Sequence, residues 1–152
     1  MFSLIAVLVL ALGVGAPVRD SSRKSCTRAE AIQAETEVDS LINWDRVYRS
    51  YGKFSQCDDG VIGEGYSDAV GKLLANDWVH LDRLTTLTKA NGRFRQFVVK
   101  HIDGTLSRDT LNKISSNAQS NCPTGAGKLC GLIARAVSLS LPTTEFDSGQ
   151  VK

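Results

Sequence analysis

The 152-residue sequence has no block of charge of one sign, and this absence limits its partners. Its 18 basic and 16 acidic residues are spread along the chain and leave a net charge of +2. Proteins that bind nucleic acids or anionic membrane surfaces carry clustered Lys and Arg instead. We therefore predict no nucleic-acid partner and no polybasic membrane contact.

Strand signals and long apolar runs are also missing. No segment sustains the alternation of apolar and polar residues that a half-buried strand requires, and the 3 prolines fall outside the segments with helical periodicity.

The uncharged apolar run from Phe2 to Val14 is shorter than the ~20 residues that cross a bilayer. It has the length of a signal-peptide core and is followed by small residues suited to cleavage. We predict a signal peptide at 1–16 and no membrane span after its removal.

Complete catalytic and metal-binding motifs are lacking. The sequence contains no G-x-S-x-G motif and no C-x-x-C or C-x-x-H pair. Its two histidines, His80 and His101, would need Asp82 and Asp103 to make a metal site, and no short ligand spacing supports one. His101 also lies four residues after Phe97, on the apolar side of its helix, where a buried histidine is expected. We predict no bound metal, no cofactor and no catalytic residue.

The predicted export determines how the cysteines are interpreted. An even number of cysteines in an oxidising compartment favours two disulfides, formed among Cys26, Cys57, Cys122 and Cys130. The local pair Cys122–Cys130 is favoured over a bond from either residue to Cys57. Cys26 and Cys57 can meet only if the chain between them folds back, because one straight helix over 28–53 would be about 39 Å long. We expect a secreted or periplasmic protein.

Apolar residues recur at helical spacing through most of the remaining chain. Thr27 and Glu30 have the spacing of a capping box, which marks the start of a helix. Further N-caps are predicted at Asn43, Asp58 or Asp59, Asp77 and Ser107. The sequence therefore predicts an all-α, single-domain bundle of about five to seven short helices over 24–140, followed by a flexible tail at 141–152.

Residues 122–130, CPTGAGKLC, come close to the phosphate-binding P-loop of nucleotide hydrolases. A P-loop follows a strand, and no β-branched run precedes this stretch. Leu129 replaces the hydroxyl residue that binds magnesium, and only 22 residues follow Cys130. We therefore predict no nucleotide binding, and we expect Thr124 to cap the last helix.

Acidic and aromatic side chains gather in the middle of the sequence. Glu64 and Asp68 are four residues apart and so share a helix face. A glycosidase would need two carboxylates about 5 to 10 Å apart across a cleft, but acidic residues in a first helical turn are also expected from the helix dipole. We predict a binding patch made of Asp58, Asp59, Glu64, Tyr66 and Asp68.

Three stretches resemble a family of small exported bacterial helical proteins that has no assigned function. They are QCDDGVIGEGYSDAV (Gln56 to Val70), FRQFVVKHID (Phe94 to Asp103) and NCP…LC (Asn121 to Cys130). The resemblance covers more than half of the chain and implies no catalytic residues. In general character these proteins are similar to periplasmic immunity proteins, which are short, helical and disulfide-bonded and plug the active site of a toxin.

Together these features predict a non-enzymatic, secreted or periplasmic protein-binding domain. Its specific form would be an immunity or inhibitor protein that occludes a partner's site. A cell-wall-directed hydrolase that uses Glu64 with Asp68 or Asp59 is the alternative, and a structural envelope protein is another. The sequence does not distinguish a structural envelope protein from a protein-binding domain.

Overall fold

The computed structural model describes residues 24–141, which form seven α-helices and two short 3-10 helices and contain no strand. In chain order these are α1 (Arg28–Val38), α2 (Trp44–Phe54), η1 (Ser55–Cys57), α3 (Gly60–Asn76), η2 (Trp78–His80), α4 (Leu81–Ala90), α5 (Gly92–Lys100), α6 (Arg108–Ser120) and α7 (Gly127–Ser140). The predicted all-α single domain is confirmed. The predicted signal peptide at 1–16 and all but the first residue of the predicted tail lie outside the described residues.

Helices α1 and α2 fold back on each other, which the Cys26–Cys57 bond requires. Thr27 and Glu30 form the predicted capping box at the start of α1. Asn43 accepts a hydrogen bond from the amide of Arg46 and caps α2. Because the chain reverses between these helices, the Cα atoms of Cys26 and Cys57 lie 4.9 Å apart and the disulfide forms.

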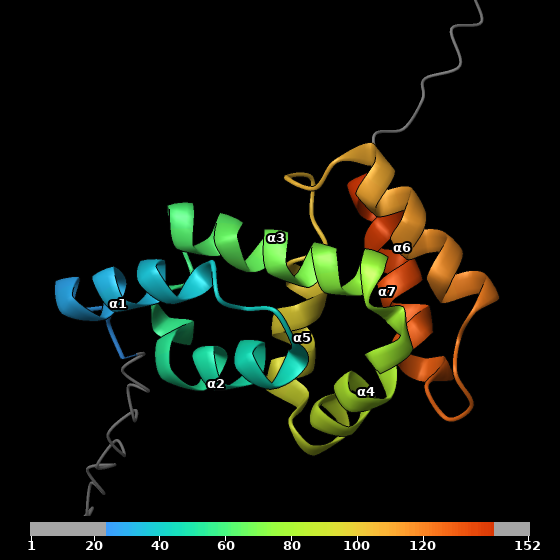
Figure 1. Cartoon of the computed structure of the whole chain (residues 1–152), viewed down its shortest axis with the longest axis horizontal. Coiled ribbons are helices and arrows are strands. Elements are labelled where there is room, and N and C mark those ends of the chain that lie inside the picture. Colours follow the sequence, from blue (N-terminus) through green and yellow to red (C-terminus); the bar gives the residue numbers. More distant parts are fainter. Residues whose placement is uncertain (1–23, 142–152) are drawn as a thin grey trace, which may run out of the picture.

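Helix α3 crosses the middle of the molecule (Figure 1), with α1 and α2 at one end and α6 and α7 at the other. Two glycines allow the close approach of its neighbours. A Cβ on Gly65 would lie 2.8 Å from the Cβ of Val38 in α1, and a Cβ on Gly71 would lie 2.6 Å from Leu106, just before α6. These contacts hold α3 between the two halves of the bundle.

The prediction that the Asp77 side chain caps the helix that carries Leu81, Leu84 and Leu87 is wrong. Residues 78–80 form the 3-10 helix η2, and α4 begins at Leu81. The Asp77 side chain makes no cap hydrogen bond, because its carboxylate lies 2.6 Å from Nδ1 of His80 instead. Asn91 ends α4 and caps α5, with its side chain accepting from the amides of Arg93 and Phe94.

The last two helices, α6 and α7, pack side by side (Figure 1). Ser107 caps α6 as predicted. Their buried residues join one continuous core with those of the other helices, and its largest fully buried side chains include Trp44, Tyr66 and Phe94. Within 24–141 no helix has both the length and the apolar character needed to cross a bilayer.

Candidate functional site

The structure divides the five predicted binding residues into two groups. Asp59, Glu64 and Asp68 are exposed to solvent. Tyr66 is completely buried, and the Asp58 side chain is only 9% exposed. The prediction that all five form one surface patch is therefore wrong for Asp58 and Tyr66.

Glu64 and Asp68 belong to an exposed ridge along α3, which we define as Glu64, Asp68, Lys72 and Asn76. These residues recur every four positions, so they follow one side of the helix. Asp59 starts this helix as its N-cap and accepts a hydrogen bond from the amide of Gly60. Asp68 forms an ion pair with Lys72, and both side chains stay more than half exposed.

A hollow lies on each side of the α3 ridge. The first, of about 630 Å³, is bounded by the ridge and by residues 105–107 with Thr110. The second, of about 420 Å³, lies between the ridge residues 68–76 and the end of α1 with the turn that follows it. Its wall includes Val38, Leu41 and Ile42, and the Ile42 side chain is 69% exposed. Apolar residues bordered by polar ones, as in this hollow, are the usual anatomy of a protein-binding surface.

The buried member of the acidic group, Asp58, joins α5 to the start of α3. Its Oδ2 atom accepts a hydrogen bond from Lys100 Nζ at 2.8 Å and lies 3.2 Å from Nε2 of His101. Burial alone would raise the pKa of Asp58, but the hydrogen bonds from His101 and Lys100 outweigh it and hold the pKa below its usual value. Asp58 is therefore a buried carboxylate between two basic side chains.

Ser67 belongs to this cluster as well, although nothing in the local sequence pattern indicates it. Its hydroxyl lies 2.9 Å from Nδ1 of His101 and donates to Oδ2 of Asp103 at 2.8 Å. Both Ser67 and His101 are only 2% exposed. A Ser-His-Asp group can activate a nucleophile. Here, however, the serine is buried away from solvent, and its hydroxyl donates its hydrogen bond to the Asp103 carboxylate and not to the histidine. The arrangement therefore binds these segments together and does not present a reactive hydroxyl.

Tyr66 has a second structural role beside this cluster. Its hydroxyl lies 2.8 Å from the Ser50 hydroxyl of α2, and burial raises the pKa of Tyr66. Its ring packs edge-on against Phe97, whose ring in turn packs against His101. Tyr66 shares the helical spacing of Ile62, Val70 and the other buried residues of α3, and this spacing in the sequence is typical of a core position.

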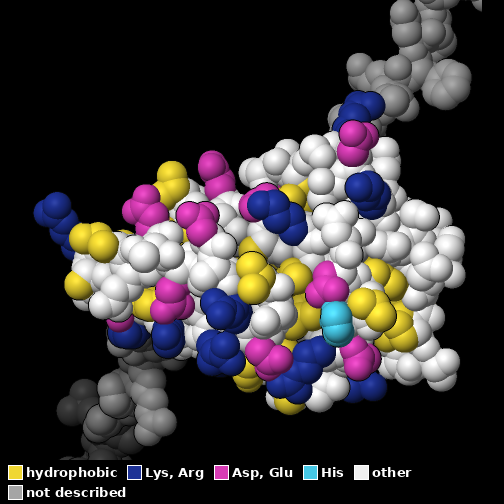
Figure 2. Space-filling model, viewed as in Figure 1, with side chains coloured by type: hydrophobic (Ala, Val, Ile, Leu, Met, Phe, Trp, Pro, Cys, Tyr) yellow, Lys and Arg dark blue, Asp and Glu magenta, His cyan; other side chains and the backbone are white. Residues whose placement is uncertain are grey.

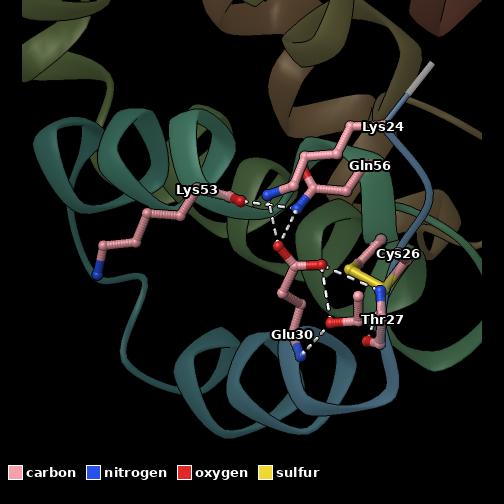
Figure 3. Close-up of polar contacts among 7 residues, drawn as sticks. Lys24, Cys26, Thr27, Glu30, Lys53 and Gln56 are labelled. Carbon is pink, nitrogen blue, oxygen red and sulfur yellow. Dashed lines mark hydrogen bonds and ion pairs between the residues drawn. A yellow bond between two sulfur atoms is a disulfide. The ribbon is translucent and has the colours of Figure 1, made fainter. Parts of the chain in front are cut away.

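A second polar network surrounds the Cys26–Cys57 disulfide (Figure 3). The Glu30 carboxylate accepts hydrogen bonds from Lys24 and Gln56 on one oxygen and from Thr27 on the other. The hydrogen bonds from Lys24 and Thr27 lower the pKa of Glu30 to about 2. This network fixes the segment before α1 against the end of η1.

The CPTGAGKLC stretch is closed by the predicted Cys122–Cys130 disulfide, whose Cα atoms are 6.1 Å apart. Helix α6 precedes it, where a phosphate-binding loop would have a strand. Gly125 has a φ of 82°, which suits glycine at the turn before α7. The prediction that Thr124 caps this helix is wrong, because Ala126 holds the N-cap position and makes no side-chain cap.

The two histidines lie in different environments and are not brought together with Asp82. His80 pairs with Asp77 on the surface, whereas His101 is buried beside Asp58. Within residues 24–141, no group of three or more His, Cys, Asp and Glu side chains has an arrangement that could hold a metal ion.

Charge is unevenly distributed on the face seen in Figure 2. Acidic side chains predominate along the edge over α1 and the first part of α3, while the Lys and Arg side chains along the opposite edge alternate with acidic ones. Helix α1 with the residue after it carries four acidic residues and one basic residue (Glu30, Glu35, Glu37, Asp39 and Arg28), whereas α2 carries three basic residues and one acidic residue (Arg46, Arg49, Lys53 and Asp45). The α3 ridge and its hollows therefore lie on the more acidic side.

Comparison of the chain with models of known families, with curated proteins and with solved structures finds no match.

Proposed function

We propose that this protein is a non-enzymatic binding domain that covers a basic site on a protein partner. The binding surface is the α3 ridge with its two hollows. The observation that carries this proposal is the α3 ridge itself, where Glu64 and Asp68 stand in solvent beside the first hollow and Asp68 also borders the second, which exposes Ile42. With Asp39 at the rim of the second hollow, this surface has more acidic than basic groups and favours a partner rich in Lys and Arg.

A secreted or periplasmic location belongs to the same proposal. Two disulfides within 24–141 suit an oxidising compartment, and the apolar run at Phe2 to Val14 suits export. An immunity or inhibitor protein is the form that best joins these properties, because such a protein needs a rigid surface and no catalytic group.

The surface gives no support to the hydrolase alternative. A catalytic acid needs a carboxyl group that is shielded from water, so that its pKa rises. Glu64 is exposed, and Asp68 is exposed and paired with Lys72. Exposed acidic side chains of this kind suit recognition of a basic surface.

The test compares partner capture by three versions of the oxidised chain from an extract of the producing cells' envelope. The double variant Glu64→Lys/Asp68→Lys reverses the charge of the α3 ridge. The control Glu35→Lys/Gln33→Lys adds the same number of positive side chains on the exposed side of α1. We expect the wild type and the control to retain one and the same partner and the ridge variant to lose it.

Equal capture by all three proteins would overturn the α3 ridge as the binding surface. Failure of the wild type to retain any protein would overturn the binding function itself. Hydrolysis of cell-wall polymer by the wild type that is lost in Glu64→Gln would instead establish the enzyme alternative.

A further inference from the structure

The buried cluster around His101 makes three polar contacts in a row. Asp58 Oδ2 lies 3.2 Å from Nε2 of the ring, Nδ1 lies 2.9 Å from the Ser67 hydroxyl, and that hydroxyl lies 2.8 Å from Oδ2 of Asp103. The contacts join four separate segments: the turn before α3, α3 itself, the end of α5 and the loop after it. We call this row the His101 chain.

The number of protons in the His101 chain follows from its geometry. A carboxylate only accepts hydrogen bonds, so the single hydroxyl proton of Ser67 points to Asp103. Nδ1 of His101 must then donate to Ser67, and Nε2 must donate to Asp58. With only one proton on the ring, one of the three contacts would join two acceptors at hydrogen-bonding distance.

The charged groups around the ring support this proton count. Asp58 comes from the turn before α3, Asp103 from the loop after α5, and Lys100 from α5 itself, while Tyr66 of α3 faces the ring at a centroid distance of 5.6 Å. Burial would raise the pKa of Asp103, but hydrogen bonds from Thr105 and Ser67 lower it below its usual value, and the pKa of Asp58 is lowered as well. Both carboxyl groups are thus ionised, and the ring is left to supply the donors.

The loop after α5 connects this chain to the proposed binding surface. Asp103 Oδ1 accepts hydrogen bonds from the amide and the hydroxyl of Thr105. Thr105, with Leu106 and Ser107, forms one wall of the hollow beside Glu64 and Asp68. Leu106 also packs against Gly71 of α3. A change at Asp103 is therefore passed directly to a wall of that hollow.

We propose that His101 carries two ring protons in the folded protein, and that loss of one releases Asp103 and shifts the 105–107 wall, so that proton concentration regulates the α3 binding surface. The regulatory part rests on the proposed function, whereas the proton count does not. Between about pH 6.5, where a histidine in an unfolded chain loses its ring charge, and the higher pH at which the folded ring loses its second proton, the folded chain holds one proton more than the unfolded chain. Unfolding then releases a proton, so the folded state loses stability as the pH rises.

The variant Asp103→Asn tests the proton count because it preserves the shape of the chain. The Asn amide group would donate to Ser67, the Ser67 hydroxyl to Nδ1, and Nε2 to Asp58, so every contact survives with a neutral ring. The Asn carbonyl oxygen still accepts from Thr105. His80→Gln is introduced first and gives the parent protein, in which His101 is the only histidine of the sequence. The Asp103→Asn variant is made in this parent protein.

Nitrogen-15 NMR of the ring gives the first readout at about pH 7. We expect both ring nitrogens of the parent protein to have the shifts of protonated nitrogen, and Nδ1 of Asp103→Asn to have the shift of an unprotonated one. A neutral ring in the parent protein would overturn the proposal whether or not the variant folds. Urea unfolding gives the second readout: the unfolding constant of the parent should rise up to about tenfold per pH unit above pH 6.5, and that of the variant by less than about twofold.

Amide shifts test the connection to the surface without a partner. As His101 titrates, the amides of residues 105–107 and Glu64 should shift with the same midpoint in the parent and stay constant in Asp103→Asn. Shifts confined to residues 101–103 would overturn the regulation and leave the proton count standing. The charge-reversal experiment on the α3 ridge tests the binding function separately. Failure of the proposed regulation can therefore be distinguished from failure of the proposed binding function.

Discussion

The two disulfides close loops of very different length, and this difference predicts how much each one stabilises the fold. Cys26–Cys57 spans 31 residues and Cys122–Cys130 spans 8. Loop-closure entropy assigns the longer bridge about 3.7 kcal/mol of the free energy of unfolding and the shorter one about 2.5 kcal/mol. Replacing the longer bridge with Cys26→Ser/Cys57→Ser should therefore destabilise the protein by about 1 kcal/mol more than Cys122→Ser/Cys130→Ser.

The longer bridge should also have a local effect that the shorter one lacks. Helix α1 has 11 residues and a single fully buried side chain, Ala34, so its own contacts hold it weakly. Among residues 24–141, the network around Glu30 is what would hold the segment before α1 in place without Cys26–Cys57. We expect α1 to separate from the bundle more often than α6 and α7 do.

Urea unfolding at neutral pH measures the first effect, and amide hydrogen exchange measures the second. Exchange should accelerate over Arg28–Val38 in the Cys26→Ser/Cys57→Ser variant and stay slow in α6 and α7. An equal or larger loss of stability in the Cys122→Ser/Cys130→Ser variant would refute the entropy-based reasoning. Faster exchange spread evenly over all helices would refute the weak attachment of α1.

Gly65→Ala should destabilise the protein by about 1–3 kcal/mol, because the added Cβ would meet the branched side chain of Val38. Gly131→Ala, on an open part of α7, should instead stabilise the protein by up to about 1 kcal/mol. Urea unfolding that ranks the two variants the other way would contradict the close α1–α3 contact. Tyr66→Phe should cost about 1–2 kcal/mol by leaving the buried Ser50 hydroxyl without its partner. Adding Ser50→Ala should recover part of that loss, and additive costs in the double-mutant cycle would exclude coupling between the two hydroxyls. Because the pKa of folded Asp58 lies below the unfolded value of about 3.9, its contribution to stability is present above that pH and is lost as the pH falls further. Asp58→Asn should therefore flatten the loss of stability on acidification, and the neighbouring exposed Asp59→Asn should not; equal flattening in both variants would contradict the special role of Asp58.

Helix starts were predictable where the capping chemistry is complete within a few residues. Thr27 with Glu30, Asn43 and Ser107 each satisfy free amides of their own first turn. The same reasoning failed at Asp77 and at Thr124, because a competing structure was present at each site. His80 engages the Asp77 carboxylate, and the loop closed by Cys122–Cys130 delivers the chain into α7 without a side-chain cap.

The candidate site was predictable only in part, because its division depends on contacts between distant segments. Asp58 and Asp59 are adjacent acidic residues that local patterns treat alike. Asp58 turns inward because His101, 43 positions later, lies beside it, whereas Asp59 stays outside as the cap of α3. Ser67 carries no local signal of its role, since its partners are 34 and 36 positions away.

The period of α3 explains how one helix serves both the buried cluster and the exposed surface. Ser67 and Asp68 are adjacent, so their side chains point about 100° apart around the axis, one to His101 and the other to solvent. The charge of the α3 ridge acts through solvent and weakens as salt is added, whereas the His101 chain acts through the 105–107 wall and is shielded from salt by burial. Ionic strength and pH should therefore change the binding affinity independently, because salt screens the exposed residues of α3 whereas pH changes the His101 chain on the buried side of the same helix.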